Sequence, residues 1–222
     1  MRSSDAATIA RVGLAFAIVY LIIERIVPWF DVLLLTIAYL TDWVDGYLAV
    51  REESKGRVSF SLYIRAALGN AGAKAKISPI KAGISKHAPH GPRMDVAGDR
   101  VIEYAFWLAF IYVFFSAIGM VAGAIAIFLV LLVVTRHAFA DALMGARGTS
   151  SKMQTRFAKI FYTSNASRGL INAVKFLAFA YLVLFYVLNY PAYIEYVLVA
   201  LLFLIIMLRG AAEIYESVKI RK

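Results

Sequence analysis

Cysteine is absent from the 222 residues, so the chain has no disulfide, no thiol nucleophile and no thiolate metal site. Acidic residues are also scarce, with 14 Asp and Glu against 24 Lys and Arg, which gives a formal net charge of +10. Hydrophobic residues make up 62% of the chain, above the roughly 45–50% of soluble domains. In so apolar a chain, the positive charge indicates membrane topology and anionic head groups rather than nucleic acid.

The first apolar run ends in Glu24-Arg25 rather than in a small-residue cleavage site. We therefore expect no cleavable signal peptide. The chain also shows no internal repeat and no low-complexity segment. These features predict a single transmembrane domain over residues 1–222, interrupted by a polar insertion at residues 52–90.

Long apolar runs account for most of the sequence. A helix needs about 20 mostly apolar residues to cross a bilayer. Six stretches meet this requirement: residues 8–27, 31–50, 95–116, 119–140, 168–188 and 192–211. The sequence therefore predicts an all-α integral membrane protein with six transmembrane helices.

Lysine and arginine are missing from the short connections between these runs, at residues 28–30, 117–119 and 189–191. The stretch 51–94 holds nine basic residues, and the stretch 141–168 holds five more. Basic loops stay on the cytoplasmic side of a membrane. We therefore expect both termini and both long loops to be cytoplasmic.

The stretch 51–94 has a mixed pattern. Residues 58–65 alternate between apolar and polar side chains, as in a strand, whereas residues 65–76 are rich in alanine and favour a helix. We expect the stretch to form a basic surface against lipid head groups. The histidines are expected in solvated loop or interface positions; they are His87, His90 and His137.

Four aspartates form two pairs on either side of the insertion. Asp42 and Asp45 are three residues apart and Asp95 and Asp99 four apart, so each pair lies on one face of a helix, which Glu103 continues. Carboxylates gathered near a membrane surface repel unless they share protons or bind cations, and hard divalent cations take carboxylate oxygens. Because ionisable groups in spans are costly, we favour a functional site. The alternative is a set of interfacial charges paired with Lys or Arg.

Small residues at fixed positions make the two pairs part of one ordered motif. Its fixed residues are Asp42, Asp45, Gly46, Ala49, Gly91, Asp95 and Asp99. The motif resembles the signature D-x-x-D-G-x-x-A-R…G-x-x-x-D-x-x-x-D of the CDP-alcohol phosphotransferases. Six spans, cytoplasmic termini and the length of the chain also suit that family.

The resemblance implies a metal-dependent enzyme of phospholipid biosynthesis, which moves a phosphatidyl- or archaetidyl-type group from a CDP-linked lipid to a small polar alcohol and releases CMP. It implies two Mg²⁺ or Mn²⁺ ions on the four aspartates, with Asp99 also acting as general base. A homodimer with its active site facing the cytoplasm is implied as well. Contacts to the CDP moiety are implied for Asp42, Gly46, Ala49, Arg51, Gly91, Arg93 and Asp95.

The chain departs from the family pattern in two places. Val50 stands where the family has arginine, and Arg51 follows it. Successive helical residues are about 100° apart, so Arg51 points away from the expected direction unless the helix unwinds there; Arg93 and Arg100 are the alternative phosphate contacts. The spacer that ends at Gly91 is also much longer than in the family, which places the insertion where it would cover the nucleotide site or bind a partner.

The stretch 136–145 resembles the R-A-x-A-E-x-x-G stretch of the phosphatidylinositol-phosphate and archaetidylinositol-phosphate synthases. That resemblance favours an acceptor-phosphate pocket of Arg136, Arg156 and Arg168, since arginine binds phosphate bidentately. Alternatively, these arginines are ordinary cytoplasmic-side residues. A phosphorylated polyol such as inositol phosphate or glycerol phosphate, serine, and glycerol all stay open as acceptors, and the donor is diacylglycerol- or archaeol-based.

Two other functions fit parts of the pattern. A divalent-cation transporter would use the aspartates as an ion path, but its acids would be spread through the depth of the bilayer. A non-catalytic membrane scaffold of the same fold would tolerate the loss of arginine at Val50. The clustering of the aspartates near one membrane face favours the enzyme.

Overall fold

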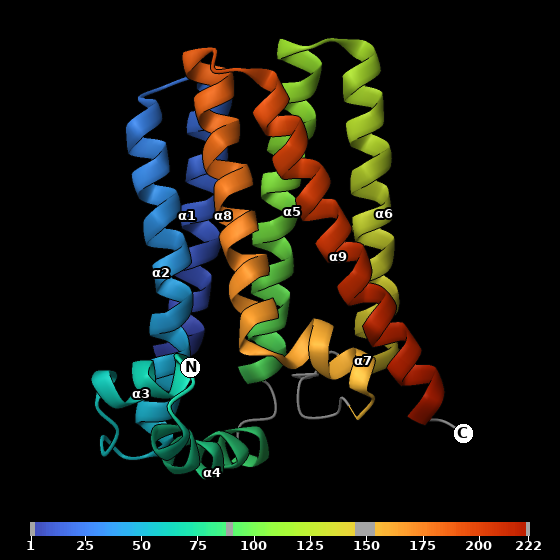
Figure 1. Ribbon diagram of the computed structural model, residues 1–222. Coiled ribbons are helices and arrows are strands. Elements are labelled where there is room, and N and C mark those ends of the chain that lie inside the picture. Colours follow the sequence, from blue (N-terminus) through green and yellow to red (C-terminus); the bar gives the residue numbers. More distant parts are fainter. Residues whose placement is uncertain (1–2, 88–90, 145–153, 221–222) are drawn as a thin grey trace.

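The structure is a computed structural model that describes residues 3–87, 91–144 and 154–220, and within these residues the regular elements are all helices, without strands (Figure 1). The elements in chain order are α1 (Ser3–Glu24), α2 (Pro28–Glu53), α3 (Phe60–Ala67), α4 (Ala71–His87), α5 (Gly91–Ala117), α6 (Met120–Met144), α7 (Arg156–Ala158), the π-helical turn η2 (Lys159–Thr163), α8 (Asn165–Leu188) and α9 (Ala192–Ile220).

Six of these helices are long and apolar enough to cross a membrane, namely α1, α2, α5, α6, α8 and α9. The prediction of an all-α fold with six helices able to span a membrane is confirmed, and these helices indicate an integral membrane protein. Some helices extend past the predicted apolar stretches into polar residues: α2 continues to Glu53 and α9 to Ile220. Figure 1 shows the six helices side by side, with α3, α4, α7 and both ends of the chain at the same end of the bundle.

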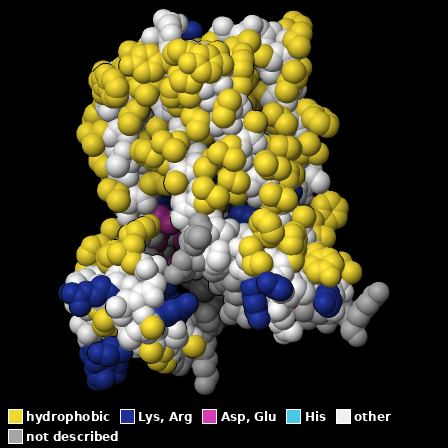
Figure 2. All heavy atoms as spheres, in the orientation of Figure 1, with side chains coloured by type: hydrophobic (Ala, Val, Ile, Leu, Met, Phe, Trp, Pro, Cys, Tyr) yellow, Lys and Arg dark blue, Asp and Glu magenta, His cyan; other side chains and the backbone are white. Residues whose placement is uncertain are grey.

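Aromatic side chains of α5 form the centre of the bundle. Phe106, Trp107 and Phe110 are each at most 1% exposed, and Phe106 stacks on Phe179 of α8 with ring centroids 5.0 Å apart. The outward faces of the helices carry large exposed hydrophobic side chains, which form the broad yellow band in Figure 2. A band of this kind suits contact with lipid.

The insertion contains two helices, and the strand pattern expected for residues 58–65 is wrong. Residues 60–65 lie in α3, which begins where the side chain of Ser59 accepts a hydrogen bond from the backbone N–H of Leu62. Val58 and Ile77 of the insertion bury against Val50 of α2. Alternation over so short a stretch is compatible with either structure, and the N-cap together with packing on α2 decides for the helix.

Candidate active site

The four motif aspartates lie at the end of the bundle that carries α3 and α4. Asp42 and Asp45 come from α2, and Asp95 and Asp99 come from the first turns of α5. One carboxylate oxygen from each of Asp42, Asp45 and Asp95 lies within 4.8 Å of the others. Residues about fifty positions apart in sequence therefore meet at one place, and Figure 2 shows acidic atoms in a recess between the apolar band and the basic end.

Arg11 of α1 joins all four aspartates into one cluster, and the sequence analysis missed it. Its guanidinium hydrogen-bonds to Asp42 and, at 2.6 Å, to Asp99. The same group lies 3.6 Å from Asp45 and 3.7 Å from Asp95. A sequence signal existed, because Arg11 is the one charged residue between Asp5 and Glu24 in an apolar span, and such a residue is costly unless it has a function or a partner.

Close packing of α1 on α5 places Arg11 between the aspartates. A Cβ at Gly98, beside Asp99, would collide with the Cγ2 methyl of Thr8, one helical turn before Arg11. The glycine therefore allows the two helix backbones to approach closely. α1 also packs along α2, so it bridges the two halves of the motif.

The residues present fit a divalent cation. Four carboxylates against the single guanidinium of Arg11 leave a formal charge of −3, and the donor set consists of oxygens, as Mg²⁺ and Mn²⁺ prefer. The Oδ2 atom of Asp45 is buried and accepts no hydrogen bond from the residues that the structure describes. Asp42, Asp95 and Asp99 are 41%, 53% and 48% exposed, so the cluster is open to solvent. The alternative interpretation, in which the aspartates pair with Lys or Arg, is met in part by Arg11. One guanidinium nevertheless leaves the cluster with excess acidic charge.

A second polar network lies one turn deeper along α5. Glu103, 5% exposed, accepts a hydrogen bond of 2.5 Å from Lys175 of α8. The side chain of His137 is 2% exposed and 3.9 Å from Glu103, so the expectation of a solvated or interfacial histidine is wrong. Arg100 donates two hydrogen bonds, of 2.9 and 3.0 Å, to Asp141. Polar groups paired across helices in this way hold α5, α6 and α8 together.

We expect replacement of Lys175 by methionine to destabilise the bundle. Removing one partner of a buried ion pair costs about 3–5 kcal/mol, and because Lys175 is 22% exposed we take the lower value, roughly 6–12 °C in Tm. Thermal unfolding in detergent measures the loss. The double variant Lys175→Met with Glu103→Gln should recover most of it, while Lys74→Met on the exposed face of α4 serves as the control. An unchanged Tm in Lys175→Met would contradict this role.

The residues predicted to contact CDP lie on α2 and on the first turns of α5. Gly46 and Ala49 are half-buried, and Gly46 is covered by the hydroxyl of Tyr63 from the insertion. Arg51 lies within the continuous helix α2 and is exposed, so the helix does not unwind to re-aim it. Gly91 begins α5, and the side chain of Arg93 lies outside the part of the chain that the structure describes.

Val50 and the insertion, the two departures from the family pattern, belong to one structural unit. The side chain of Val50 is 1% exposed and packs against Val58 and Ile77 of the insertion. An arginine at this position would place a charge inside that apolar contact, which is unfavourable without a partner. The long insertion therefore accounts for valine at position 50.

The three arginines predicted to hold an acceptor phosphate lie in different settings. Arg136 is 10% exposed and pairs with Glu213 of α9 at 2.5 Å. Arg156 begins the short helix α7 and is exposed. The side chain of Arg168 lies outside the described residues. Arg136 already has an acidic partner, and an acceptor-phosphate site of these three arginines stays a prediction.

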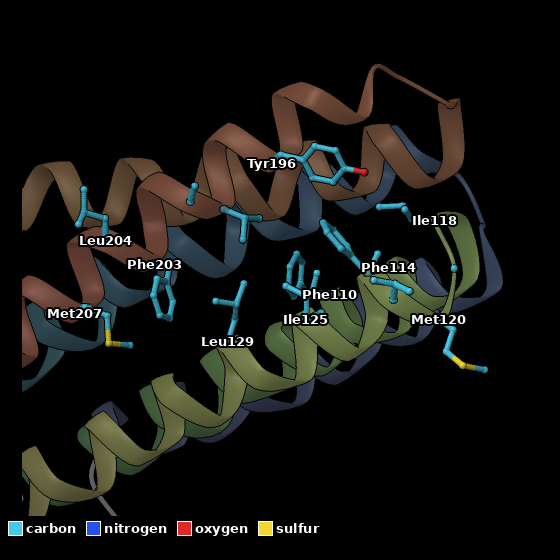
Figure 3. Close-up of a pocket in the computed structure, with 16 residues that line it drawn as sticks. Phe110, Phe114, Ile118, Met120, Ile125, Leu129, Tyr196, Phe203, Leu204 and Met207 are labelled. Atoms are coloured by element: carbon cyan, nitrogen blue, oxygen red, sulfur yellow. The ribbon is translucent and has the colours of Figure 1, made fainter.

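An apolar cavity lies away from the aspartates. It has a volume of about 850 Å³ and opens between α5, α6 and α9 beside the α5–α6 connection (Figure 3). Apolar side chains line it, among them Phe110, Phe114, Leu129, Phe203 and Met207. It suits hydrocarbon rather than polar chemistry, so the candidate site is the aspartate cluster at the other end.

Comparison with known proteins gives no match: no family model, no curated protein and no solved structure corresponds to this chain. The interpretation of the cluster therefore depends on its residues and geometry.

Proposed function

We propose that this chain is a metal-dependent CDP-alcohol phosphotransferase that transfers a phosphatidyl- or archaetidyl-type group from a CDP-linked lipid to a small polar alcohol. One observation carries the proposal. The aspartates of both halves of the motif meet in one solvent-open cluster with acidic charge in excess. The cluster lies at the end of long apolar helices, where a water-soluble head group and a lipid tail would both have access.

Asp42, Asp45 and Asp95 would hold the divalent ions, with Asp99 completing the set. When bound, such ions neutralise charge on the pyrophosphate of the donor and align the reacting groups. Arg11 holds the four carboxylates together and balances part of their charge. Arg11 and the bound ions together would offset the acidic charge, so that a donor that itself carries negative charge could bind at the cluster.

Asp99 would act as general base on the acceptor. It lies on the deeper turn of α5, toward the lipid-facing part of the bundle, with a carboxylate that is half exposed. The acceptor oxygen forms a new bond to the lipid-linked phosphorus, the bond from that phosphorus to CMP breaks, and the proton of the hydroxyl moves to Asp99. General bases of this kind contribute about 10²–10⁴ to the rate.

We place the aspartate cluster, both termini and the insertion on the cytoplasmic side. The support is the distribution of basic residues, which concentrate in the segments that Figure 1 shows at this end of the bundle. The lipid tails of the donor would lie among the apolar helices, and by resemblance the enzyme would act as a homodimer. For the acceptor we favour a phosphorylated polyol, with exposed Arg156 as a phosphate contact; serine and glycerol are the alternatives.

A non-catalytic scaffold is the second candidate, because one observation favours it: Arg11 pairs with every aspartate of the motif. In a scaffold the guanidinium would be the permanent counter-ion of the cluster. The two candidates therefore differ in whether divalent cations bind alongside Arg11.

Assay of the purified protein in lipid vesicles tests the proposal. A CDP-linked lipid, as diacylglycerol or archaeol, is supplied with Mg²⁺ or Mn²⁺ and with inositol phosphate, glycerol phosphate, serine or glycerol in turn. We expect CMP release that needs both the metal and one of these acceptors. Metal binding without CMP release would support a scaffold, and cation flux across the vesicle membrane without CMP release would support a transporter.

A further inference from the structure

The insertion reaches the candidate site through Tyr63 of α3. A Cβ at Gly46 would collide with the Tyr63 hydroxyl and would lie 3.5 Å from its ring atom Cζ. Glycine inside a helix costs about 1 kcal/mol relative to alanine, so its place beside Asp45 calls for a group that approaches the backbone. In this structure that group is the hydroxyl of Tyr63.

Contacts within and around the insertion hold Tyr63 in this position. Lys81 of α4 lies over its ring, with the ammonium nitrogen 5.3 Å from the ring centroid, a favourable cation–π distance. Tyr47 of α2 packs against both Tyr63 and Phe60, with ring centroids 5.9 and 5.1 Å apart. The side chain of Tyr63 is therefore fixed by α2 on one side and by α4 on the other.

The helix that carries Tyr63 is the less firmly packed of the two insertion helices. None of the residues of α3 is buried, whereas α4 buries Ala73 and Ile77. Gly56 and Gly69, which flank α3, have φ values of +81° and +97°, a backbone conformation that glycine adopts without strain. Few buried contacts mark a segment that opens at low free-energy cost, so α3 can withdraw while α4 stays in place.

We propose that Tyr63 is a plug on the nucleotide side of the site, which a cytidine nucleotide must displace from Gly46 in order to bind. The inference rests on the proposed function, because the resemblance places the CDP moiety beside Gly46 and Ala49. Tyr63 and the nucleotide compete for the same space, so binding of the nucleotide moves α3 away from α2.

The packing at Val50 supports this arrangement. Where the family places an arginine for the nucleotide phosphate, this chain has an apolar contact with Val58 and Ile77 of the insertion. A fixed charged contact on the nucleotide is thus replaced by a segment that covers the same region. The insertion therefore accounts both for the segment that covers the nucleotide side of the site and for valine in place of arginine at position 50.

Titration of the purified protein with CMP in the presence of Mn²⁺ tests the plug. With the plug in place about nine-tenths of the time, Tyr63→Ala lowers the apparent Kd about tenfold, since apparent affinity scales with the open fraction. Tyr63→Phe, which removes only the hydroxyl, gives a smaller decrease. Lys81→Met loosens the plug without altering Tyr63 and shifts the Kd in the same direction. Leu68→Ala, at an exposed position just after α3, leaves it unchanged.

A double-mutant cycle measures the contact itself, without nucleotide. Gly46→Ala lowers the Tm in the presence of Tyr63, whereas in the Tyr63→Phe background it leaves the Tm unchanged or raises it, because the colliding atom is gone and alanine is the better helix former. An unchanged or higher Kd for CMP in Tyr63→Ala and Lys81→Met, or no coupling in the cycle, overturns the plug alone. Failure of CMP to bind to the wild type and every variant, with coupling intact, overturns the proposed function and the plug with it.

Discussion

Replacement of Asp99 by asparagine is expected to lower metal-dependent CMP release by a factor of roughly 10²–10⁴, the contribution of a general base. The amide keeps the size of the side chain but does not accept the proton of the acceptor hydroxyl. The amide oxygen of asparagine still accepts the hydrogen bond that Arg11 donates to Asp99 at 2.6 Å, although without the negative charge, and Asp42 continues to hold the guanidinium. The fold should therefore persist while turnover falls, and CMP release from a CDP-linked lipid measures the effect.

Asp31 offers a matched control on the same helix as Asp42 and Asp45. Its carboxylate is buried near the beginning of α2, and neither of its oxygens has a hydrogen-bond partner among the described residues. Because it lies at the opposite end of the helix from the cluster, Asp31→Asn should retain activity. Equal loss in Asp31→Asn and Asp99→Asn would indicate a general effect of removing acids from the spans, and full activity in Asp99→Asn would exclude it as the base.

Replacement of Arg11 by methionine is expected to make the stability of the protein depend on divalent cations. The formal charge of the cluster falls from −3 to −4 when the guanidinium is lost. Removing a buried partner costs about 3–5 kcal/mol; because three of the four carboxylates are about half exposed, we take about 3 kcal/mol, which corresponds to a Tm lower by roughly 6–12 °C.

Thermal unfolding with EDTA and with Mn²⁺ separates the two roles of Arg11. Because a ligand that binds only the folded state stabilises it, Mn²⁺ should raise the Tm of Arg11→Met more than that of the wild type. Arg57→Met, at an exposed position before α3, should match the wild type in both conditions. If Mn²⁺ leaves the Tm of Arg11→Met as low as EDTA does, the aspartates do not form a divalent-cation site.

The order and spacing of residues are sufficient to predict the long helices and the two aspartate pairs. Runs of about twenty apolar residues must form helices in a bilayer because every backbone polar group needs an internal partner. For that reason the six spans follow from composition and length. The pairing of Asp42 with Asp45 and of Asp95 with Asp99 follows in the same way, because helical periodicity is a local property.

The insertion shows where local pattern is insufficient. Alternation over residues 58–65 fits a strand, yet residues 60–65 lie in α3, because Ser59 caps the helix and Val58 packs against Val50 of α2 and Ile77 of α4. His137 likewise resembles an interface residue in sequence, but lies buried beside Glu103. In both cases, the deciding contacts come from other helices, which a window of sequence does not contain.

The sequence by itself determined the helical class, the six spans and two acidic pairs, because each depends on neighbours a few residues away. Only the tertiary structure decided that the pairs meet, that Arg11 from α1 lies among them and that Tyr63 covers Gly46. These contacts join residues 17 to 88 positions apart, and they depend on how closely α1 packs on α5 and α3 on α2. Close approach of this kind is set by the shapes of whole helix faces, which no single segment specifies.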